Sequence, residues 1–283
     1  MRSIRLFCIV SLLVIALTVV GCAPAAPEAK EVPESMEKLS QIQDQGFFVY
    51  GLEAQYRPFE FRDDKDNIVG YDVDVANEIG KRMGVEARPV DIAWNVVLES
   101  LYEGQFDLVI GGMTANEKRY ERVNFSVPYM NAGAGILVVE GEITEFADLD
   151  GKTVGSGEGT PATELLQLKA DELVITFAED IKTYDDDAPA YEALKTGRIF
   201  AYASTIASLA DYASNNPGFE VLPLTSDDWD LRWTCIAFRK EDGGFRAMAN
   251  GILLEMKEDG TLDSLQEKWF TKTFETPNTP PTW

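Results

Sequence analysis

The stretch IGGMTANEKRYERVNFSVPY, residues 110–129, decides how the rest of the chain is organised. The apolar, β-prone run 106–110 leads into it and predicts a buried strand. Two glycines then permit backbone conformations that a Cβ would forbid. Thr114 supplies a hydroxyl, and Arg119 supplies a planar guanidinium that suits a carboxylate. A strand that ends in glycines before a helix start favours an anion site. An ordinary strand–turn–helix with a surface arginine stays open at this point.

The residues before this stretch alternate between strand and helix patterns. We expect strands at 47–51 and 87–90 and helices at 73–83 and 94–103. This order predicts an α/β fold with a mostly parallel sheet and helices on both faces. Ligands of such sheets bind beyond the carboxyl ends of the strands. The loop 52–58, the start of the helix at 94 and the residues 111–119 are therefore expected to meet.

A second α/β cycle begins near residue 153. Strands are expected at 153–155, 181–184, 201–204 and 219–222, and helices at 161–170, 188–196 and 205–215. Thr160 is the expected N-cap of the first of these helices, and Asp187 that of the second. The glycine-rich turn 156–160 lacks the Gly-Lys-Ser/Thr of a phosphate loop and contains Glu158, which would repel phosphate. The turn favours a helix start that binds a carboxylate.

The chain is expected to cross twice between the two α/β units. The segments 133–139 and 231–238 are the expected crossings, and the strand 233–238 returns to the first unit. Helices at 245–258 and 261–270 follow. Two lobes joined by a two-strand hinge, with a ligand cleft between their strand ends, suit closure on a small ligand. The Pro/Thr-rich residues 276–283 are expected to be a frayed tail.

Charge and composition exclude several classes of function. The 283 residues contain 25 Lys and Arg against 48 Asp and Glu, a formal net charge of -23, which disfavours binding to nucleic acid. The absence of histidine removes the commonest general base and zinc ligand. Cys8, Cys22 and Cys235 have no metal-site spacing, and Cys235 is expected in the core. We therefore expect no metal and no cofactor.

The N-terminus resembles an export signal. Arg2 and Arg5 precede the apolar run 6–20, which is short for a membrane span. The run ends at Gly21-Cys22, which resembles a bacterial lipoprotein signal, in which the cysteine is lipidated and becomes the mature N-terminus. A plain signal peptide or an uncleaved anchor stays open. The Ala/Pro/Glu-rich residues up to 35 predict an extended tether. The expected location is outside the cell membrane, lipid-anchored to its outer face or periplasmic.

The body of the chain carries a set of motifs. They are YRPFEF at 56–61, VGYDVD at 69–74, GQFD at 104–107, GMT at 112–114, VNFS at 123–126, and DGTL at 259–262. With Arg119 and Gly197-Arg198, these resemble the extracellular solute-binding proteins of the polar amino-acid ABC uptake type (solute-binding family 3), from about residue 36 to residue 270.

The resemblance implies a two-lobe, periplasmic-binding-protein-like (type II) fold. The implied divisions are a signal peptide at 1–21, a tether at 22–35, a first lobe at 36–138 and 233–275, a second lobe at 139–232, and a tail at 276–283. It also implies a substrate-binding component, not an enzyme, that captures a polar amino acid or related small carboxylate and delivers it to an ABC permease.

The resemblance also implies a carboxylate clamp on the first lobe. The family's arginine at the Arg119 position holds the ligand α-carboxylate through charge-assisted hydrogen bonds. Thr114 and the backbone at Gly112 meet the α-carboxylate and α-amine. Aromatic rings at Tyr56 and Trp94 enclose the ligand side chain.

Further implied contacts come from three other residues. The helix start at Thr160 adds N–H groups from the second lobe, and Glu53 pairs with a cationic ligand side chain. At position 205 the family carries an aspartate that holds the α-ammonium, whereas this chain has Thr205. Pro161 removes one further N–H. A modified amino acid, a betaine-like cation or an organic acid without the amine stays open, as does a charge supplied by Glu53 or Glu158.

Two rival functions stay open at this point. A dehydratase-like enzyme on the same fold needs a positioned acid or base, and only Glu53 or Glu158 could serve. A sensor that presents its ligand to a signalling partner is disfavoured by the lack of a second span. The acidic clusters 63–64, 185–187 and 227–228 are expected to be solvated faces and caps.

Overall fold

The structure is a computed structural model that describes residues 35–224 and 233–283. The expected signal segment and nearly all of the expected tether lie outside these residues, as do the last positions expected in the second lobe. Within the described part of the chain, no helix is both long enough and apolar enough to cross a membrane.

The first lobe is built on a five-stranded sheet with the order β5-β1-β6-β15-β7. Its strands are β1 (Phe47–Leu52), β5 (Glu86–Asp91), β6 (Leu108–Val109), β7 (Val123–Phe125) and β15 (Ala237–Arg239). Strand β1 pairs in parallel with β5 and β6, and β15 runs antiparallel to β6 and β7. The expected parallel β-α-β-α-β order is therefore confirmed, and the returning strand enters between β6 and β7.

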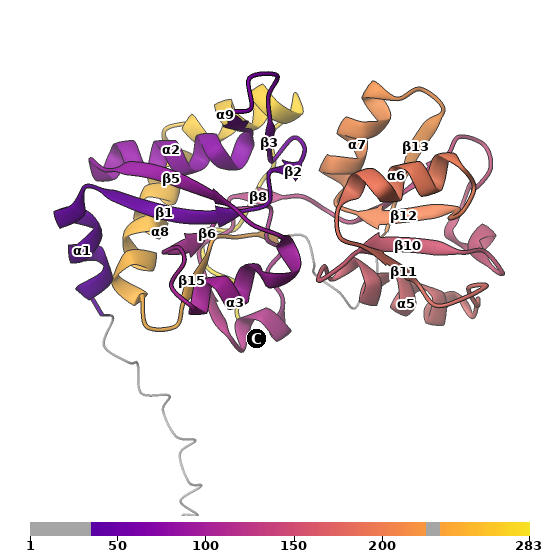
Figure 1. The fold of residues 1–283 in the computed structure, drawn as a ribbon, viewed down its shortest axis with the longest axis horizontal. Coiled ribbons are helices and arrows are strands. Elements are labelled where there is room, and N and C mark those ends of the chain that lie inside the picture. Colours follow the sequence, from indigo (N-terminus) through magenta and orange to yellow (C-terminus); the bar gives the residue numbers. More distant parts are fainter. Residues whose placement is uncertain (1–34, 225–232) are drawn as a thin grey trace, which may run out of the picture. The chain divides into compact units, whose positions relative to one another are not determined.

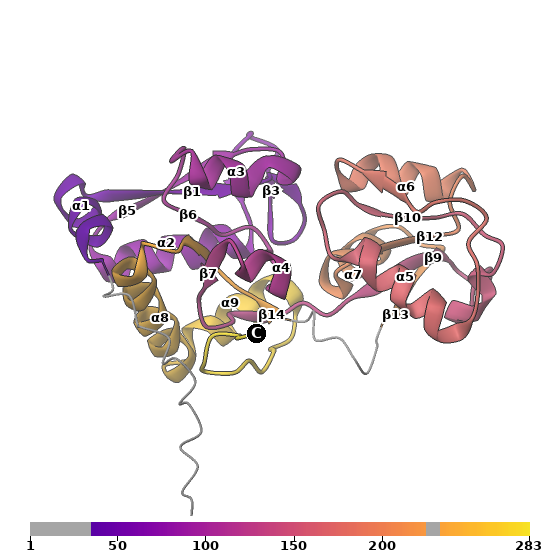
Figure 2. The same ribbon diagram turned by 90° about the horizontal axis from the view of Figure 1, so that it is seen from below.

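Helices cover both faces of this sheet (Figures 1 and 2). They are α1 (Glu37–Gln45), α2 (Tyr71–Met83), the 3₁₀ turn η1 (Trp94–Val96), α3 (Val97–Tyr102), α4 (Glu117–Tyr120), α8 (Gly243–Glu258) and α9 (Thr261–Phe270). Figure 2 shows α3 on one side of β1 and β6, and α2 and α8 on the other. Successive residues of a strand face opposite sides, so Leu108 packs with α2 and α8 while Val109 packs with α3.

A small three-stranded sheet extends the first lobe directly after β1. It consists of β2 (Gln55–Tyr56), β3 (Glu60–Arg62) and β4 (Ile68–Val69), in antiparallel pairs. The expected loop 52–58 thus forms β2 in part. Tyr56 pairs with Glu60 in this register, and the pairing fixes the backbone position from which the Tyr56 side chain extends.

The second lobe has its own five-stranded sheet, in the order β11-β10-β12-β9-β13. Its elements are β9 (Gly135–Val139), the 3₁₀ turn η2 (Phe146–Leu149), β10 (Val154–Gly157), α5 (Ala162–Leu173), β11 (Lys182–Tyr184), α6 (Asp187–Lys195), β12 (Ala201–Ser204), α7 (Ile206–Asn215) and β13 (Phe219–Pro223). Strands β10, β11 and β12 are parallel, and β9 is antiparallel to both of its neighbours. The carboxyl ends of β10, β11 and β12 therefore share one edge.

Two short paired strands link the lobes. Strand β8 (Met130–Asn131) pairs antiparallel with β14 (Trp233–Thr234), so the two expected crossings run side by side. The expected strand 133–139 is confirmed from Gly135 onward as β9, whereas the expected strand 233–238 is divided into β14 and β15. In the second, the backbone of Ile236 bonds to Ser126 where the chain passes from β14 to β15. The predicted α/β architecture of two lobes joined by two crossings is confirmed.

Helix starts and the C-terminal tail differ from expectation. Asp186, not Asp187, caps α6: its backbone is extended and its side chain accepts the Ala188 N–H at 2.9 Å. Helix α5 begins at Ala162, one residue later than expected. The tail is not frayed from the domain, because the Trp283 ring lies 5.4 Å from that of Tyr120, an apolar contact that the sequence pattern does not reveal.

Candidate functional site

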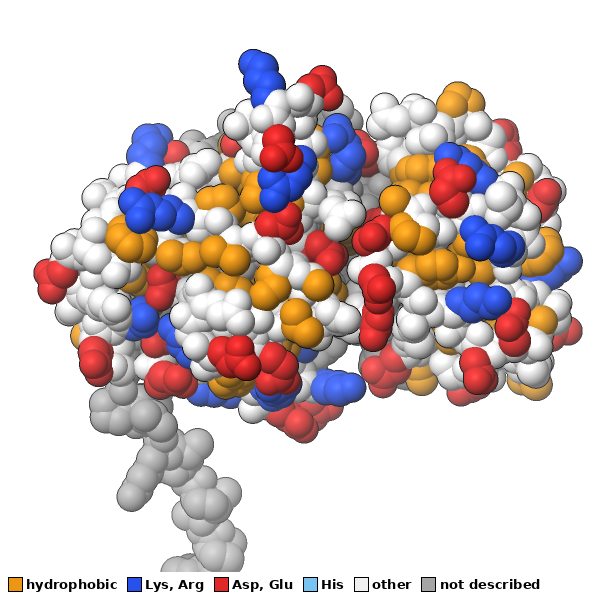
Figure 3. Space-filling model, in the orientation of Figure 1, with side chains coloured by type: hydrophobic (Ala, Val, Ile, Leu, Met, Phe, Trp, Pro, Cys, Tyr) orange, Lys and Arg blue, Asp and Glu red, His pale blue; other side chains and the backbone are white. Residues whose placement is uncertain are grey.

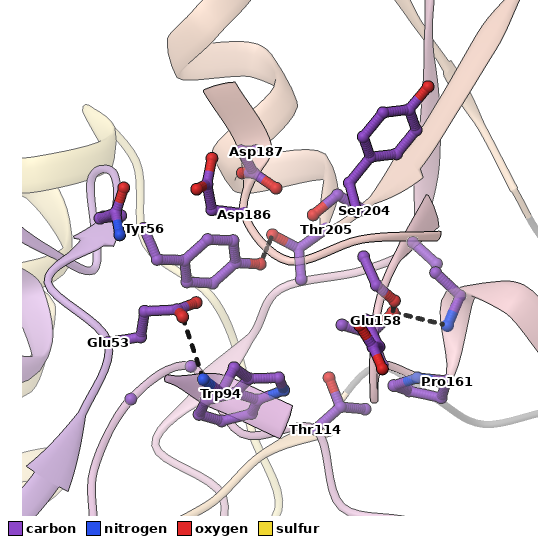
Figure 4. A pocket seen from close by; sticks show the side chains of 18 of the residues that line it. Glu53, Tyr56, Trp94, Thr114, Glu158, Pro161, Asp186, Asp187, Ser204 and Thr205 are labelled. Atoms are coloured by element: carbon purple, nitrogen blue, oxygen red, sulfur yellow. Dashed lines mark hydrogen bonds between the residues drawn. The ribbon is translucent and has the colours of Figure 1, made fainter. Parts of the chain in front are cut away.

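A pocket lies where residues of both lobes meet, and all eight predicted site residues line it (Figure 4). These are Glu53, Tyr56, Trp94, Gly112, Thr114, Arg119, Thr160 and Thr205. Figure 4 labels Glu53, Tyr56, Trp94, Thr114 and Thr205 among them. The first six of the eight come from the ends of first-lobe strands and the loops after them, and the last two come from the second lobe. The structure therefore brings together every predicted residue; which ligand groups they bind stays a prediction.

Arg119 is a buried cation whose bonded partners are all neutral. Asn116 caps the short helix α4 by accepting the Arg119 N–H at 2.8 Å, and this cap sets the direction of the side chain. The guanidinium donates to the carbonyls of Thr114 at 2.7 Å and Gly159 at 2.9 Å. Arg119 is only 8 % exposed, and it forms no ion pair with a described carboxylate. Burial lowers its pKa to about 10, because the cation lacks a countercharge.

Gly112 shapes the floor of the pocket. Its φ of +60° and the closeness of Tyr56, 2.7 Å from where a Cβ would lie, both require glycine. Its N–H donates to the buried carboxylate of Asp72, which also accepts the Tyr129 hydroxyl at 3.0 Å. The Gly112 N–H is therefore occupied by Asp72, and contact of the Gly112 backbone with a ligand stays a prediction. Asp72 is fully buried beside Glu60, and burial raises its pKa to about 7.

Tyr56 and Thr205 connect the two lobes. The Tyr56 ring stacks on Phe59, with 5.0 Å between centroids and 9° between planes. Its hydroxyl lies 2.7 Å from the hydroxyl of Thr205, as Figure 4 shows. Thr205 is the N-cap of α7 and accepts the Ser208 N–H at 3.3 Å. A polar residue is needed at this cap, so Thr205 has a structural role as well as a place in the pocket.

Glu53 and Trp94 form the opposite wall. The Glu53 carboxylate accepts the Trp94 N–H at 3.0 Å, which fixes the carboxylate at the entrance to η1. Burial raises the pKa of Glu53 to about 7 despite this hydrogen bond, and nearby acids add to the rise. The Trp94 ring centroid lies 5.5 Å from the Arg119 guanidinium carbon. An aromatic face, a carboxylate and a guanidinium thus border the same space.

The turn before α5 differs from its predicted form. The Thr160 hydroxyl donates to the Gly157 carbonyl at 2.8 Å, and only a long 3.4 Å contact joins it to the Ala162 N–H. Thr160 therefore closes the turn rather than capping α5. Glu158 is exposed in the same turn, and the hydrogen bond that its protonated carboxyl donates to Asp185 raises its pKa.

Asp187 is a pocket residue that the sequence reasoning missed. It was expected as a solvated cap, whereas the structure has it partly buried in the pocket lining. Its carboxylate accepts the hydroxyls of Tyr202 at 2.6 Å, Tyr191 at 3.1 Å and Ser208 at 3.3 Å. Its position at the start of α6, just beyond the carboxyl end of β11, could have indicated this. Ligands bind beyond the carboxyl ends of parallel strands in both lobes.

The pocket is strongly acidic. Among the described residues that line it, Arg119 is the one cation. The acids that line it are Glu53, Glu60, Glu158, Asp185, Asp186 and Asp187. Acidic side chains are also spread over the visible surface of each lobe (Figure 3). The excess of carboxylates favours a ligand that carries more positive than negative charge.

Two α/β lobes, two crossing strands and a polar pocket lined from both lobes define a solute-binding protein. The chain belongs to the bacterial extracellular solute-binding proteins, family 3, whose model matches residues 48–272. The two-lobe fold and family expected from the motifs are confirmed.

The chain is similar to several amino-acid-binding proteins. The L-cystine-binding protein TcyJ of Escherichia coli K12 is 34% identical over 236 residues, which cover 82% of this chain and 85% of TcyJ. ABC transporter arginine-binding protein 1 of the same organism is 29% identical over 223 residues, 78% of this chain and 89% of that protein. The structure also resembles that of the ancestral amino acid-binding protein AncCDT-1, a precursor of cyclohexadienyl dehydratase. That likeness has a TM-score of 0.71 with 32% identity, and covers 82% of this chain and 99% of the other.

Proposed function

We propose that this protein is the substrate-binding component of an ABC-type uptake system and that it captures an L-amino acid with a cationic side chain. The relatives bind amino acids, and their place in ABC transporters supports delivery to a permease. The eight pocket residues that the family resemblance predicted supply the contacts.

The buried guanidinium of Arg119 is the observation that carries the proposal. A buried cation without a countercharge is costly, and a ligand carboxylate supplies that charge through two parallel hydrogen bonds. The guanidinium now donates to two carbonyls, which a carboxylate can replace in part. Thr114, whose carbonyl already accepts from the guanidinium, also lines the pocket and offers a hydroxyl to the same carboxylate.

The remaining charges favour arginine or lysine over cystine. Cystine has two carboxylates, and Arg119 can neutralise only one of them; no second cation lines the described part of the pocket. A cationic amino acid has one carboxylate and two positive groups, which matches one arginine among several acids. Glu53, next to the Trp94 ring, is the acid that we assign to the ligand side chain.

Titration calorimetry on protein stripped of ligand by unfolding and refolding tests this function. The panel is L-arginine, L-lysine, L-glutamine and L-cystine. We expect the cationic amino acids to bind most tightly, with a dissociation constant of about 1 μM, or about −8 kcal/mol. Tighter binding of L-cystine would contradict the charge argument, and no binding of any member would contradict the function.

The affinity for L-arginine should depend on the protonation of Glu53. Because the pKa of Glu53 in the empty site is about 7, its negative charge is lost as the pH falls from 8 to 6. We expect the affinity of the wild type to fall severalfold over this range. Glu53→Gln should lower the affinity for L-arginine about tenfold at pH 8. It should also make this affinity nearly independent of pH.

Glu158→Gln serves as the matched control, since it removes a carboxylate from the same pocket lining at an exposed position. It should keep the pH dependence of the wild type. An unchanged pH dependence in the Glu53 variant would assign the effect to another group.

A second candidate function has one observation in its favour. A carboxyl with a pKa of about 7, as in Glu53, suits general acid–base catalysis at neutral pH, which a dehydratase-like enzyme needs. We infer binding without turnover, because the named relatives are binding proteins. Mass spectrometry of the ligand after long incubation distinguishes the two: unchanged ligand supports binding alone, and a dehydrated product supports an enzyme.

We also propose that the chain is exported and anchored through a lipid on Cys22. The basic start, the apolar run and Gly21 before Cys22 support this, although they lie outside the described residues. We also propose the division of the chain into signal peptide, tether, two lobes and tail that the family resemblance implies. Cys22→Ser should move the protein from the membrane fraction to the soluble exported fraction; retention in the membrane would contradict lipid anchoring at this cysteine.

A further inference from the structure

We propose that the carboxylate of Asp187 receives the α-ammonium of the ligand, and so takes over the role that position 205 has in the family. The inference rests on the proposed amino-acid function and names the residue that binds the α-amine of that ligand. The proposal explains how the pocket can hold both ends of an amino acid. Arg119 binds the carboxylate, but the neutral Thr205 stands where the family has an aspartate for the ammonium.

Thr205 itself is poorly placed to bind an ammonium group. A hydroxyl has one donor and two acceptor positions, and two of these three are occupied by the Tyr56 hydroxyl and the Ser208 N–H. The residue is also neutral. An ammonium that left water for Thr205 alone would lose its hydration without gaining a countercharge.

Asp187 lies next to Thr205, on the same wall of the pocket. Ser208 joins them, because its hydroxyl donates to Asp187 at 3.3 Å and its N–H donates to Thr205 at 3.3 Å. Figure 4 shows both side chains near the hydroxyl end of Tyr56. Burial raises the pKa of Tyr56, and the negative charge of Asp187 is the next largest cause, which agrees with this closeness.

The surroundings of Asp187 orient its carboxylate and leave room for one more donor. Oδ1 accepts the Tyr202 hydroxyl, and Oδ2 accepts those of Tyr191 and Ser208. A carboxylate offers about four acceptor positions, so one remains for an ammonium. No described cation forms an ion pair with Asp187, and burial raises its pKa; a ligand ammonium would supply the charge that keeps the ionised form stable.

The other acids of the second lobe suit this role less well. Glu158 and Asp185 are exposed and lie beside each other, so water screens them. The Asp186 carboxylate accepts the Ala188 N–H as the cap of α6. Asp187 and Arg119 belong to different lobes, so a ligand held by its carboxylate and its ammonium would join the lobes and favour their closure.

The test compares two ligands that differ only in the α-amine. L-arginine and 5-guanidinopentanoic acid, its amine-free analogue, are titrated into the wild type, Asp187→Asn and Asp171→Asn. We expect Asp187→Asn to weaken L-arginine at least tenfold and to change the affinity of the analogue less than threefold. Asp171→Asn removes the same charge from an exposed position of α5 outside the pocket lining, so it should change neither affinity more than threefold.

Rescue at position 205 gives a second, independent readout. Aspartate is a good N-cap, so Thr205→Asp in the Asp187→Asn background should fold and return the L-arginine affinity to within threefold of the wild type. Thermal melting of each variant checks that it is folded. An equal loss of both ligands in Asp187→Asn, no loss of either, or no rescue would overturn the role of Asp187. Absence of any amino-acid binding by the wild type would instead overturn the proposed function.

Discussion

Replacing Arg119 by alanine should abolish detectable amino-acid binding, with a loss of at least 100-fold. Arg119 is 8 % exposed, so a ligand carboxylate that binds there exchanges water for this one countercharge. Removing one partner of a buried ion pair typically costs about 3–5 kcal/mol, because the other charge stays buried and unpaired. Arg119→Lys should also lower the ligand affinity at least tenfold, since an ammonium cannot form two parallel hydrogen bonds with a carboxylate.

Stability of the empty protein separates this loss from misfolding. In the ligand-free state Arg119 is a buried cation without an ion-pair partner in the described residues, so Arg119→Met should melt no lower than the wild type. Added L-arginine should raise the melting temperature of the wild type and leave that of the variant unchanged. Arg122→Ala is the control: Arg122 pairs with Glu99 on the surface, and its loss should keep ligand binding. Wild-type affinity in Arg119→Ala would contradict the clamp.

Replacing Gly112 by alanine should lower the affinity for the ligand about 30-fold while the protein stays folded. The new Cβ would lie 2.7 Å from Cε1 of Tyr56. Tyr56 cannot easily retreat, because its ring stacks on Phe59. The ring must therefore move toward the pocket or away from Thr205, and overpacking of this kind typically costs about 1–3 kcal/mol.

Gly104→Ala is a matched control for backbone strain. Gly104 has a φ of +76°, similar to the +60° of Gly112, but nothing lies within 4 Å of its Cβ position. Both variants should have a lower melting temperature, because alanine is unfavourable at a positive φ. Only Gly112→Ala should have a lower ligand affinity. Calorimetric titration and thermal melting of both variants measure this. Equal affinities in the two variants would show that the contact with Tyr56 does not shape the pocket.

The sequence predicted the first lobe well, because its signals are local or follow from one topological rule. The alternation of strand and helix patterns placed the carboxyl ends of β1 and β6 together, and with them Glu53, Gly112 and Arg119. The two crossings were also predicted, as was the burial of Cys235. Periodicity and glycine positions were sufficient for these features.

The features that were missed depend on contacts between distant residues. A one-residue shift of the α6 cap, from Asp187 to Asp186, turned an expected surface acid into a pocket residue held by Tyr202 and Ser208. The use of the Gly112 N–H by Asp72 likewise joins residues 40 positions apart. Cap positions and buried partners of this kind are set by tertiary packing, which a pattern of residue types along the chain does not encode.

The central claim is that the pocket recognises the α-carboxylate of an amino acid through Arg119. The most direct measurement is a calorimetric titration of ligand-stripped wild-type protein with L-arginine and with L-argininamide, in which a neutral amide replaces the carboxylate and every other group is kept. The account predicts a dissociation constant of about 1 μM for L-arginine, and binding at least 100-fold weaker for the amide. Equal affinities for the two, or binding of the amide alone, would contradict it.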